Sequence, residues 1–495
     1  MTSMIDKSLL SRLADPDLLR PAGLVGGEWI DAVSGDATFE IDNPSTGETI
    51  ARLPEMGADE TRRAIDAAYA AQKQWAEYTG KERAAILNAL FRLMIDNADD
   101  LATILTTEMG KPLAEARGEI LYGASYVEWF AEEAKRVNGD ILPGHQRDKR
   151  IMVLKQPVGV AGMITPWNFP NAMLARKMAP ALAAGCAVVS KPAEQTPLSA
   201  IALGVLAERA GLPAGLFNLI VGTDGPSIGQ EMCSNPKLRK ISFTGSTEVG
   251  RILLRQGAEQ VLKMSMELGG NAPFIVFDDA DIDAAVEGAM ISKYRNAGQT
   301  CVCANRLYVQ QNVYDEFAAK LAEKVGALKV GDGFAEGVTT GPMIDTQGLA
   351  KVEDHIADAV GKGAKIAVGG KRSNAGALFF EPTILTGVTK TMKVAREETF
   401  GPVAPLFAFD TVEDVIEQAN DTEFGLAAYF YARDLSRVWR VAEALEYGMV
   451  GVNTGLISTE TAPFGGVKQS GLGREGSHYG IEDYLEIKYV CLGGV

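Results

Sequence analysis

The sequence predicts an α/β protein with parallel sheets, and three observations support that prediction. From Ile151 onward, short runs rich in β-branched residues alternate with segments of helical length, which is typical of a parallel sheet covered by helices on both faces. A second series of the same kind begins near Pro273. The chain has 495 residues, too many for one hydrophobic core, so we expect two or three domains.

The N-terminal part is predicted to be mostly helical. Leucines at amphipathic spacing predict a short helix within residues 1–20, and residues 24–53 predict short strands and turns, one of them at Ser34-Gly35. Apolar residues at helical spacing then predict four helices. These helices cover residues 59–78, 81–97, 99 to beyond 108, and 113–137.

The two alternating series supply the remaining elements. In the first series, the predicted strands are 158–164, 187–190, 217–221, 240–243 and 263–267, and the predicted helices are 171–184, 197–210, 225–233 and 247–257. In the second series, strand 273–277, helix 281–297, strand 307–310 and helix 313–328 precede further pairs to about residue 450. The tail, 484–492, alternates like a strand, and a strand with no later partner in sequence pairs elsewhere in the fold or with another subunit.

The composition disfavours several classes of protein. The net charge of -16 and the lack of a basic run argue against a nucleic-acid or anionic-membrane partner. No apolar run approaches the ~20 residues of a membrane helix, and the N-terminus does not resemble a secretory signal. Five cysteines without framework spacing fit a reducing compartment, so we expect a cytoplasmic protein. The three histidines are scattered, which predicts no zinc or other metal site.

The stretch from Glu267 to Arg306 carries the candidate chemistry. Cys301 lies in a loop with Gly298, 34 positions after Glu267, which begins a Glu-Leu-Gly-Gly turn. A thiol becomes a nucleophile when a base takes its proton, and a carboxylate is a suitable base. A cysteine and a glutamate prove little alone, so other motifs must supply a cofactor site, an oxyanion site and a substrate pocket.

Three motifs follow predicted strands, at the edge where open α/β sheets bind ligands. Residues 243–250 open a helix whose N-terminus suits a pyrophosphate, although an ordinary strand-to-helix turn explains them equally well. Lys191 and Glu194 either bind ribose hydroxyls or form a solvated loop. Asn168, in the turn 165–170, either donates to an oxyanion or closes the turn. A fourth motif, 397–402, places a carboxylate and an aromatic ring before a Gly-Pro turn.

Taken together, these motifs resemble those of the aldehyde dehydrogenase superfamily over nearly the whole chain, from about residue 25 to the end. The doublet Cys301-Val302-Cys303 and the tail 480–488 are similar to one branch of it, the succinate-semialdehyde dehydrogenases. The motifs are Pro-Trp-Asn-Phe (166–169), Lys-Pro-Ala-Glu (191–194), Phe-Thr-Gly-Ser (243–246), Glu-Leu-Gly-Gly (267–270), Gly-Gln-Thr-Cys (298–301), Glu-Glu-Thr-Phe-Gly-Pro (397–402) and Pro-Phe-Gly-Gly (463–466).

The resemblance implies covalent catalysis on an aldehyde. Cys301 would attack the aldehyde carbon, Glu267 would be the general base, and Asn168 with the backbone N–H of Cys301 would hold the oxyanion. The thiohemiacetal would pass a hydride to a nicotinamide, and water would hydrolyse the resulting thioester. The residues that would bind the cofactor are Thr165, Trp167, Lys191, Glu194, Gly245, Ser246, Glu398 and Phe400.

The same resemblance implies succinic semialdehyde as the substrate and NAD(P) as the cofactor. Arg176, Arg295 and Ser458 would bind the substrate carboxylate, for which arginine offers a bidentate fork. Glu194 would repel a 2′-phosphate, so we expect NAD in preference to NADP.

Three alternatives stay open. Glutarate semialdehyde or another ω-carboxylated aldehyde is one, because a single methylene is worth only ~1–3 kcal/mol. A CoA-acylating dehydrogenase is disfavoured by Glu267, which suits hydrolysis. An inactive structural or binding homologue is disfavoured by the intact set of Cys301, Glu267 and Asn168.

The resemblance also implies a division into domains. A Rossmann-like NAD-binding domain would comprise 1–137 and 158–267, and an α/β catalytic domain would comprise 268–480. Residues 138–157 and 481–495 would form a small β element that joins subunits of a homodimer or homotetramer.

Cys303 raises a separate question. It lies two residues after Cys301, close to the upper limit for a disulfide in an extended segment. The hypothesis is a reversible redox switch between the two thiols, and the alternative is that Cys303 is a small packing residue.

Overall fold

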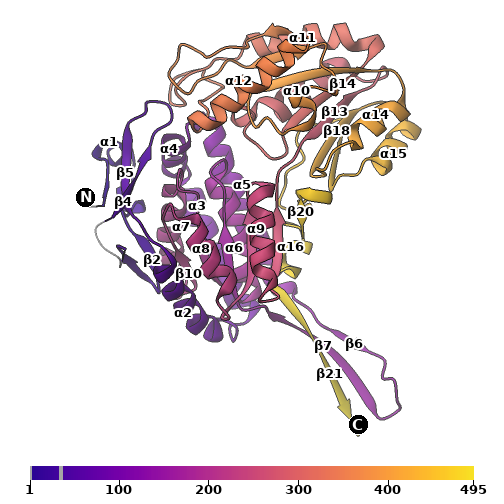
Figure 1. Ribbon diagram of the computed structural model, residues 1–495. Helices are drawn as coiled ribbons and strands as arrows, with labels where there is room; N and C mark the ends of the chain where they lie inside the picture. Colours follow the sequence, from indigo (N-terminus) through magenta and orange to yellow (C-terminus); the bar gives the residue numbers. More distant parts are fainter. Residues whose placement is uncertain (1–2, 33–36) are drawn as a thin grey trace.

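The computed structural model describes residues 3–32 and 37–495, so the predicted Ser34-Gly35 turn lies outside the described residues. The chain forms two α/β units, a small N-terminal sheet and a projecting β arm (Figure 1). The N-terminal sheet has the order β1-β5-β4. Its strands are β1 (Met4–Ile5), β4 (Thr38–Asp42) and β5 (Thr49–Pro54).

The first unit is an eight-stranded sheet with the order β20-β12-β11-β8-β9-β10-β2-β3, in which β12 to β10 run parallel. Its strands are β2 (Gly23–Val25), β3 (Glu28–Ile30), β8 (Val160–Ile164), β9 (Ala187–Lys191), β10 (Phe217–Leu219), β11 (Leu238–Thr244), β12 (Lys263–Glu267) and β20 (Gly471–Leu472). The helices around it are α2 (Ala58–Trp75), α3 (Gly80–Asp96), α4 (Ala98–Met109), α5 (Leu113–Glu133), α6 (Pro170–Ala184), α7 (Leu198–Arg209), α8 (Gly225–Ser234) and α9 (Thr247–Ala258).

The second unit is a seven-stranded sheet with the order β15-β16-β17-β14-β13-β18-β19, parallel except for β15. Its strands are β13 (Ala272–Val276), β14 (Ala304–Gln310), β15 (Lys365–Val368), β16 (Thr383–Thr386), β17 (Val403–Phe409), β18 (Ala427–Tyr431) and β19 (Met449–Val452). Its helices are α10 (Ile282–Tyr294), α11 (Tyr314–Gly326), α12 (Thr346–Gly361), α13 (Lys393–Arg396), α14 (Val412–Asn420) and α15 (Leu435–Ala444).

The projecting arm is a three-stranded antiparallel sheet with the order β21-β7-β6 (Figure 1). It consists of β6 (Asp140–Leu142), β7 (Lys149–Pro157) and the C-terminal β21 (Leu485–Gly493), which follows the short helix α16 (Tyr479–Glu482). β21 pairs with β7 over its full length, so the tail that lacks a later partner in sequence finds one earlier in the same chain. The outer edge of β21 remains unpaired within the described chain.

Two sequence-based predictions of helices are wrong in part. Residues 1–20 do not form one helix: α1 (Lys7–Leu10) ends early, and Pro16–Leu18 form a separate 3₁₀ turn whose start is capped by the Asp15 side chain. The helix predicted for 281–297 ends at Tyr294. It cannot continue because Asn296 and Ala297 adopt left-handed backbone angles, φ 54° and 53°.

The strand order of the first unit reverses beside β8. The chain passes from β8 to β9 and β10 in one direction, then returns to place β11 and β12 on the other side of β8. The turns that leave β8 and β11 therefore flank a topological switch point, where open α/β sheets bind their ligands. These turns are Thr165–Phe169 and Gly245–Ser246.

Helix α6 is the central helix of the first unit, and each of its residues from Pro170 to Ala184 is buried. Arg176 and Lys177 belong to this buried helix, so their charges require partners inside the protein. Within the two described ranges, no helix is both long and apolar enough to cross a membrane.

Candidate active site

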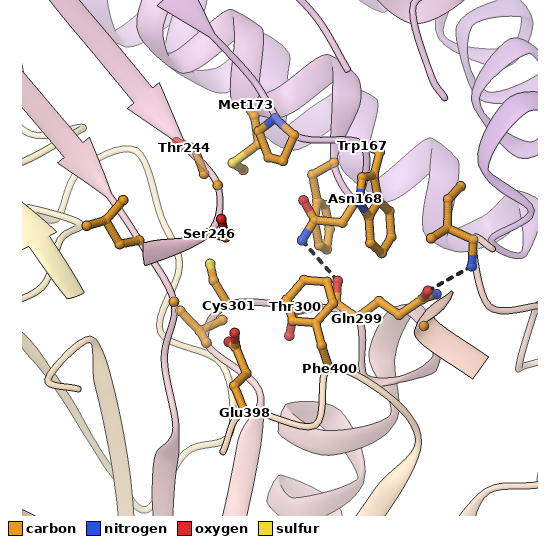
Figure 2. Close-up of a pocket in the computed structure, with 18 of the residues that line it drawn as sticks. Trp167, Asn168, Met173, Thr244, Ser246, Gln299, Thr300, Cys301, Glu398 and Phe400 are labelled. Atoms are coloured by element: carbon orange, nitrogen blue, oxygen red, sulfur yellow. Dashed lines mark hydrogen bonds between the residues drawn. The ribbon is translucent and has the colours of Figure 1, made fainter. Parts of the chain in front are cut away.

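A cavity of about 380 Å³ lies where the two α/β units meet (Figure 2). The first unit contributes the turns after β8 and β11, with Trp167, Asn168, Gly245 and Ser246. The second unit contributes two loops, one with Cys301 and one with Glu398 and Phe400. Figure 2 shows the Cys301 sulfur pointing into the space between Ser246 and Asn168. The chain thus brings four separate sequence motifs to one cavity.

The Cys301 loop is shaped by three successive residues with left-handed backbone, Asn296, Ala297 and Gly298. Two of these are not glycine, a conformation that costs free energy and persists where surrounding structure enforces it. A Cβ on Gly298 would lie 2.2 Å from the carbonyl oxygen of Gly401. The Cys301 and Glu398 loops therefore pack backbone against backbone, and glycine is required at this contact.

The Glu-Leu-Gly-Gly turn makes a second close contact, this time with the backbone of the Cys301 loop. A Cβ on Gly270 would lie 2.4 Å from the carbonyl oxygen of Cys301, so only glycine allows the turn to pass this close to the thiol loop. The backbone N–H of Gly270 donates to Oε1 of Glu398 at 3.0 Å. The turn that begins with Glu267 thus fixes the position of the Cys301 loop and holds the Glu398 carboxylate by a hydrogen bond.

Cys301 is partly buried, and its thiol forms part of the cavity wall. Burial raises its pKa to about 12, although the positive charge of Arg176 acts in the opposite direction. A thiol with this pKa is protonated at neutral pH, and only its thiolate is a strong nucleophile. The site therefore requires a base within reach of Cys301.

Glu267 is a buried carboxylate of this region, with 3% of its surface exposed, and it lies behind the residues that line the cavity. Burial and the nearby charge of Glu475 raise its pKa well above the ordinary value. Its Oε2 has no hydrogen-bond partner among the described residues, and a Cβ on Gly465 would lie 2.9 Å from Oε1. Gly465, from the Pro-Phe-Gly-Gly motif, therefore makes room for a carboxylate that has the capacity to take a proton.

Asn168 lies on the opposite side of the cavity from Glu398 (Figure 2). Its Nδ2 donates to the carbonyl oxygen of Gln299 at 3.0 Å, which ties the turn after β8 to the Cys301 loop. An amide nitrogen carries two hydrogens, so one N–H remains for a ligand. This geometry is suited to a developing oxyanion at the carbon that the thiol attacks.

The residues expected to bind a dinucleotide fall into two groups, one that lines the cavity and one that does not. Gly245 and Ser246 directly precede α9, and the Ser246 hydroxyl caps the helix by accepting from the N–H of Val249. Trp167 and Phe400 meet edge to face with ring centroids 5.6 Å apart, and burial raises the pKa of Glu398 to about 7. Lys191 and Glu194 instead form an ion pair at 3.1 Å away from the cavity lining, with the Glu194 side chain 43% exposed.

Two buried hydroxyls test whether this region suits a dinucleotide. Oγ1 of Thr165 and Oγ1 of Thr244 have no hydrogen-bond partner among the described residues. Thr165 directly follows β8 and Thr244 ends β11, on either side of the switch point, and Thr244 lies three residues before α9. Unpaired buried polar groups at a helix N-terminus fit a phosphate-bearing ligand that would satisfy them.

The three residues expected to bind a substrate carboxylate all line the cavity. Arg176 forms a buried ion pair with Glu475 and lies 4.2 Å from the ring centre of Phe464, while its Nη2 lacks a hydrogen-bond partner among the described residues. Arg295 lies 5.3 Å from the ring centre of Phe169 and has no carboxylate partner in the described chain. Ser458 completes this end of the cavity.

Sequence reasoning missed several residues of the site. Tyr122 lines the cavity from α5, and Glu475 holds both Arg176 and Lys177. Nothing in the local sequence marks either residue, because each reaches the site only through tertiary packing. Phe464 lies within the Pro-Phe-Gly-Gly motif, so that motif did carry a signal for it.

Cys303 points away from the cavity into the second unit. Its buried thiol lies 3.3 Å from Nζ of Lys293 and interacts with the carbonyl oxygen of Lys293 at 3.4 Å. All five cysteines are free thiols. A disulfide between Cys301 and Cys303 would require the loop to turn Cys303 around, and the redox switch stays a prediction.

No cluster of metal-binding side chains occurs among residues 3–32 and 37–495.

The fold and the site together define an oxidoreductase-like architecture, in which a thiol faces the topological switch point where a dinucleotide would bind. Comparison with known proteins gives its family. Residues 29–490 match the model of the aldehyde dehydrogenase family. The chain belongs to this family.

Individual relatives are similar over almost their full length. The chain is 63% identical to the succinate-semialdehyde dehydrogenase [NADP(+)] of Escherichia coli (strain K12), covering 97% of this chain and 100% of that protein. It is also 63% identical to the glutarate-semialdehyde dehydrogenase of Pseudomonas aeruginosa, covering 98% of this chain and 100% of that protein. Among solved structures, an E. coli NADP dependent enzyme superimposes with a TM-score of 0.96 at 63% identity, over 97% of this chain and 100% of that one.

The expectation that Glu194 favours NAD over NADP is wrong, because close relatives are named as NADP(+)-dependent enzymes. The structure offers a physical reason. The Glu194 carboxylate is paired with Lys191 and nearly half exposed, so its charge is offset and its side chain is free to turn into water. Such a carboxylate does not impose the repulsion on a 2′-phosphate that a fixed, buried one would.

Proposed function

We propose that this protein oxidises succinic semialdehyde to succinate with NADP as the electron acceptor. The observation that carries the proposal is the position of Cys301. Its thiol faces a cavity with a dinucleotide-type helix N-terminus on one side and two arginines, Arg176 and Arg295, on its lining. The names of the Escherichia coli relatives support the substrate and the cofactor.

The reaction begins with proton removal from Cys301. Glu267 is the proposed base, acting directly or through a water, and its raised pKa makes it a stronger base than an ordinary glutamate. The thiolate adds to the aldehyde carbon and forms a thiohemiacetal. The free N–H of Asn168 and the backbone N–H of Cys301 stabilise the oxyanion that develops there.

Conversion of the thiohemiacetal into a thioester releases a hydride, which an oxidised nicotinamide would accept if bound here. We propose that Gly245, Ser246, Thr165 and Lys191 hold the phosphate and ribose groups of the cofactor. Glu398, Trp167 and Phe400 would lie near the nicotinamide end, and Glu194 would contact the adenosine side. Glu267 then activates the water that hydrolyses the thioester and frees Cys301.

The far end of the substrate carries a carboxylate, and the cavity provides cations for it. Nη2 of Arg176 and the unpaired guanidinium of Arg295 are suited to bidentate binding, and Ser458 adds a hydroxyl. The apolar rings of Phe169 and Phe464 hold these arginines from behind. An aldehyde without a terminal anion would leave Nη2 of Arg176 without a partner and Arg295 without an ion pair, and it should bind weakly.

Glutarate semialdehyde is a second candidate substrate. A relative with 63% identity carries that name, as similar to this chain as the succinate-semialdehyde enzyme. The two aldehydes differ by one methylene, which is worth ~1–3 kcal/mol. The relative kcat/KM for the two aldehydes would separate the candidates.

The projecting arm supports an oligomer. Ile141 and Ile487 on the arm are 83% and 70% exposed, and the outer edge of β21 is unpaired within the described chain. Exposed apolar side chains beside an open strand edge form a surface suited to a second chain. We propose a homodimer or homotetramer joined through β21, β7 and β6.

Aldehyde oxidation by the purified protein tests the proposed function. With NADP, we expect NADPH formation from succinic semialdehyde, little from an uncharged aldehyde of equal length, and no requirement for CoA. Cys301→Ala should abolish the activity while leaving NADP binding intact, because Cys301 makes the only covalent bond to the substrate. NADPH formation by Cys301→Ala, or a strict requirement for CoA, would refute the proposed mechanism.

The raised pKa of Glu267 predicts the pH dependence of kcat/KM. A base works only when deprotonated, so activity should increase with pH as Glu267 loses its proton, at a pH well above that of an ordinary glutamate. Glu267→Gln should lower kcat by about 10²–10⁴-fold and remove this rising limb. An unchanged rising limb in Glu267→Gln would assign the titration to another group.

Light scattering after size exclusion tests the oligomer. The monomer mass is 52.8 kDa, and we expect two or four times that value. Ile487→Asp should shift the distribution towards smaller species, because it places a charge on the apolar arm. A wild-type protein that elutes only as a 52.8 kDa monomer would remove the proposal.

A further inference from the structure

Lys111 and Glu119 form an ion pair inside the first unit. Lys111 follows α4 in the short link to α5, and Glu119 lies on α5. Nζ of Lys111 is 2.6 Å from Oε2 of Glu119, and the two residues are 2% and 3% exposed. Neither belongs to a motif noted in the sequence, and neither lines the cavity around Cys301.

The pair contacts the Asn168 turn on both sides. Nζ of Lys111 donates to the backbone carbonyl of Asn168 itself at 2.7 Å and lies 3.8 Å from the ring centre of Phe169. Oε1 of Glu119 accepts from the backbone N–H groups of Asn171 and Ala172, at 3.0 and 3.2 Å. One ion pair therefore fixes the backbone of Asn168 and the first turn of α6 that follows it.

The same turn is connected to the thiol loop. Nδ2 of Asn296 donates to the carbonyl oxygen of Asn168 at 3.1 Å and to that of Gln299 at 3.2 Å. The Asn168 carbonyl thus accepts from Lys111 on one side and from the Cys301 loop on the other. The side-chain amide of Asn168 bonds to the same Gln299 carbonyl.

A buried ion pair of this kind is poorly explained by stability alone. Removing two charges from water is costly, and apolar replacements of buried pairs are often neutral or stabilising. A donor that must meet a developing oxyanion has a different requirement, because its position must hold within about half an ångström. The bonds from Lys111 and Glu119 act on the backbone that carries this donor.

We propose that Lys111 and Glu119 are positioning residues for the oxyanion donor: their ion pair holds the Asn168 turn so that the Asn168 amide stays directed at the Cys301 loop. This inference rests on the proposed function of Asn168. Loss of the pair shifts the donor and lowers the rate of the covalent step, while neither arginine that binds the substrate carboxylate bonds to Lys111 or Glu119.

A double-mutant cycle between Lys111 and Asn168 tests the proposal. Lys111→Met should lower kcat for succinic semialdehyde by about 10²-fold, since small displacements of catalytic groups have effects of this size. KM for the aldehyde should stay within about twofold. In the Asn168→Ala enzyme, Lys111→Met should cause almost no further loss, because the donor it positions is already absent. Equal losses of kcat in the two backgrounds would overturn the proposal.

A neutral version of the pair separates position from stability. Lys111→Met alone leaves the Glu119 charge buried without a partner and endangers folding. The double variant Lys111→Met, Glu119→Gln removes both charges and keeps an oxygen that accepts from Asn171 and Ala172. We expect a melting temperature close to that of the wild type with kcat still reduced about 10²-fold. A stable double variant with full kcat would also overturn the proposal.

Glu108→Gln is the matched control. Glu108 is a buried carboxylate on α4 that accepts from the backbone N–H groups of Leu198 and Ser199, so it caps a different helix and does not contact the Asn168 turn. The kcat of Glu108→Gln should equal that of the wild type.

The wild-type rate tests the proposed function separately. A wild type that oxidises no aldehyde would reject that function, whereas the double-mutant cycle compares only the ratios of kcat between variants.

Discussion

Enclosure of the Cys301 thiol is the constraint on which the rest of the site depends. Burial holds the thiol in its protonated form, so the nucleophile exists only when a neighbouring group removes the proton and another stabilises the charge that follows. Glu267, itself buried with a raised pKa, is the group with the matching property. Arg176 supplies positive charge to the same enclosed space and is in turn compensated by Glu475. The buried charges of the site therefore form one connected network, in which each group is stabilised by the charge of a neighbour.

Two sheets are needed to assemble this set. The first unit presents the turns at the carboxyl ends of β8 and β11, on either side of its topological switch point, and so provides the helix N-terminus of α9 and the amide of Asn168. The second unit provides the thiol loop just before β14 and the loop with Glu398. The Gly270 turn links the units and fits against the Cys301 backbone with no room for a side chain. Glycine at this position is thus required by the close approach of the turn to the Cys301 loop.

Much of this arrangement can be predicted from the sequence, for physical reasons that differ between elements. The strand 263–267 coincides with β12, and the turns at 165–170 and 243–250 follow strands as expected, because alternation, glycine and strand-to-helix transitions are local signals. The end of α10 was not predictable in this way, since the left-handed Asn296 and Ala297 are enforced by the packing of the Cys301 loop against Gly401. Glu475, Tyr122 and the Lys111–Glu119 pair lie outside the motifs, and only the folded chain shows which of their contacts reach the site. The expected role of Glu194 failed for a related reason, because the sequence does not show that its side chain is half exposed and paired with Lys191.

The central claim is that catalysis passes through a covalent bond to Cys301 whose hydrolysis depends on Glu267. Intact-mass measurement of the wild type, acid-quenched within the first turnover with succinic semialdehyde and NADP, tests this claim most directly. The account predicts that one succinyl group appears on the protein and that peptide mapping places it on Cys301, whereas Cys301→Ala acquires none and Glu267→Gln both forms and loses it more slowly than the wild type. Formation of NADPH with no acyl group on the protein, or with the acyl group on another residue, would contradict the account.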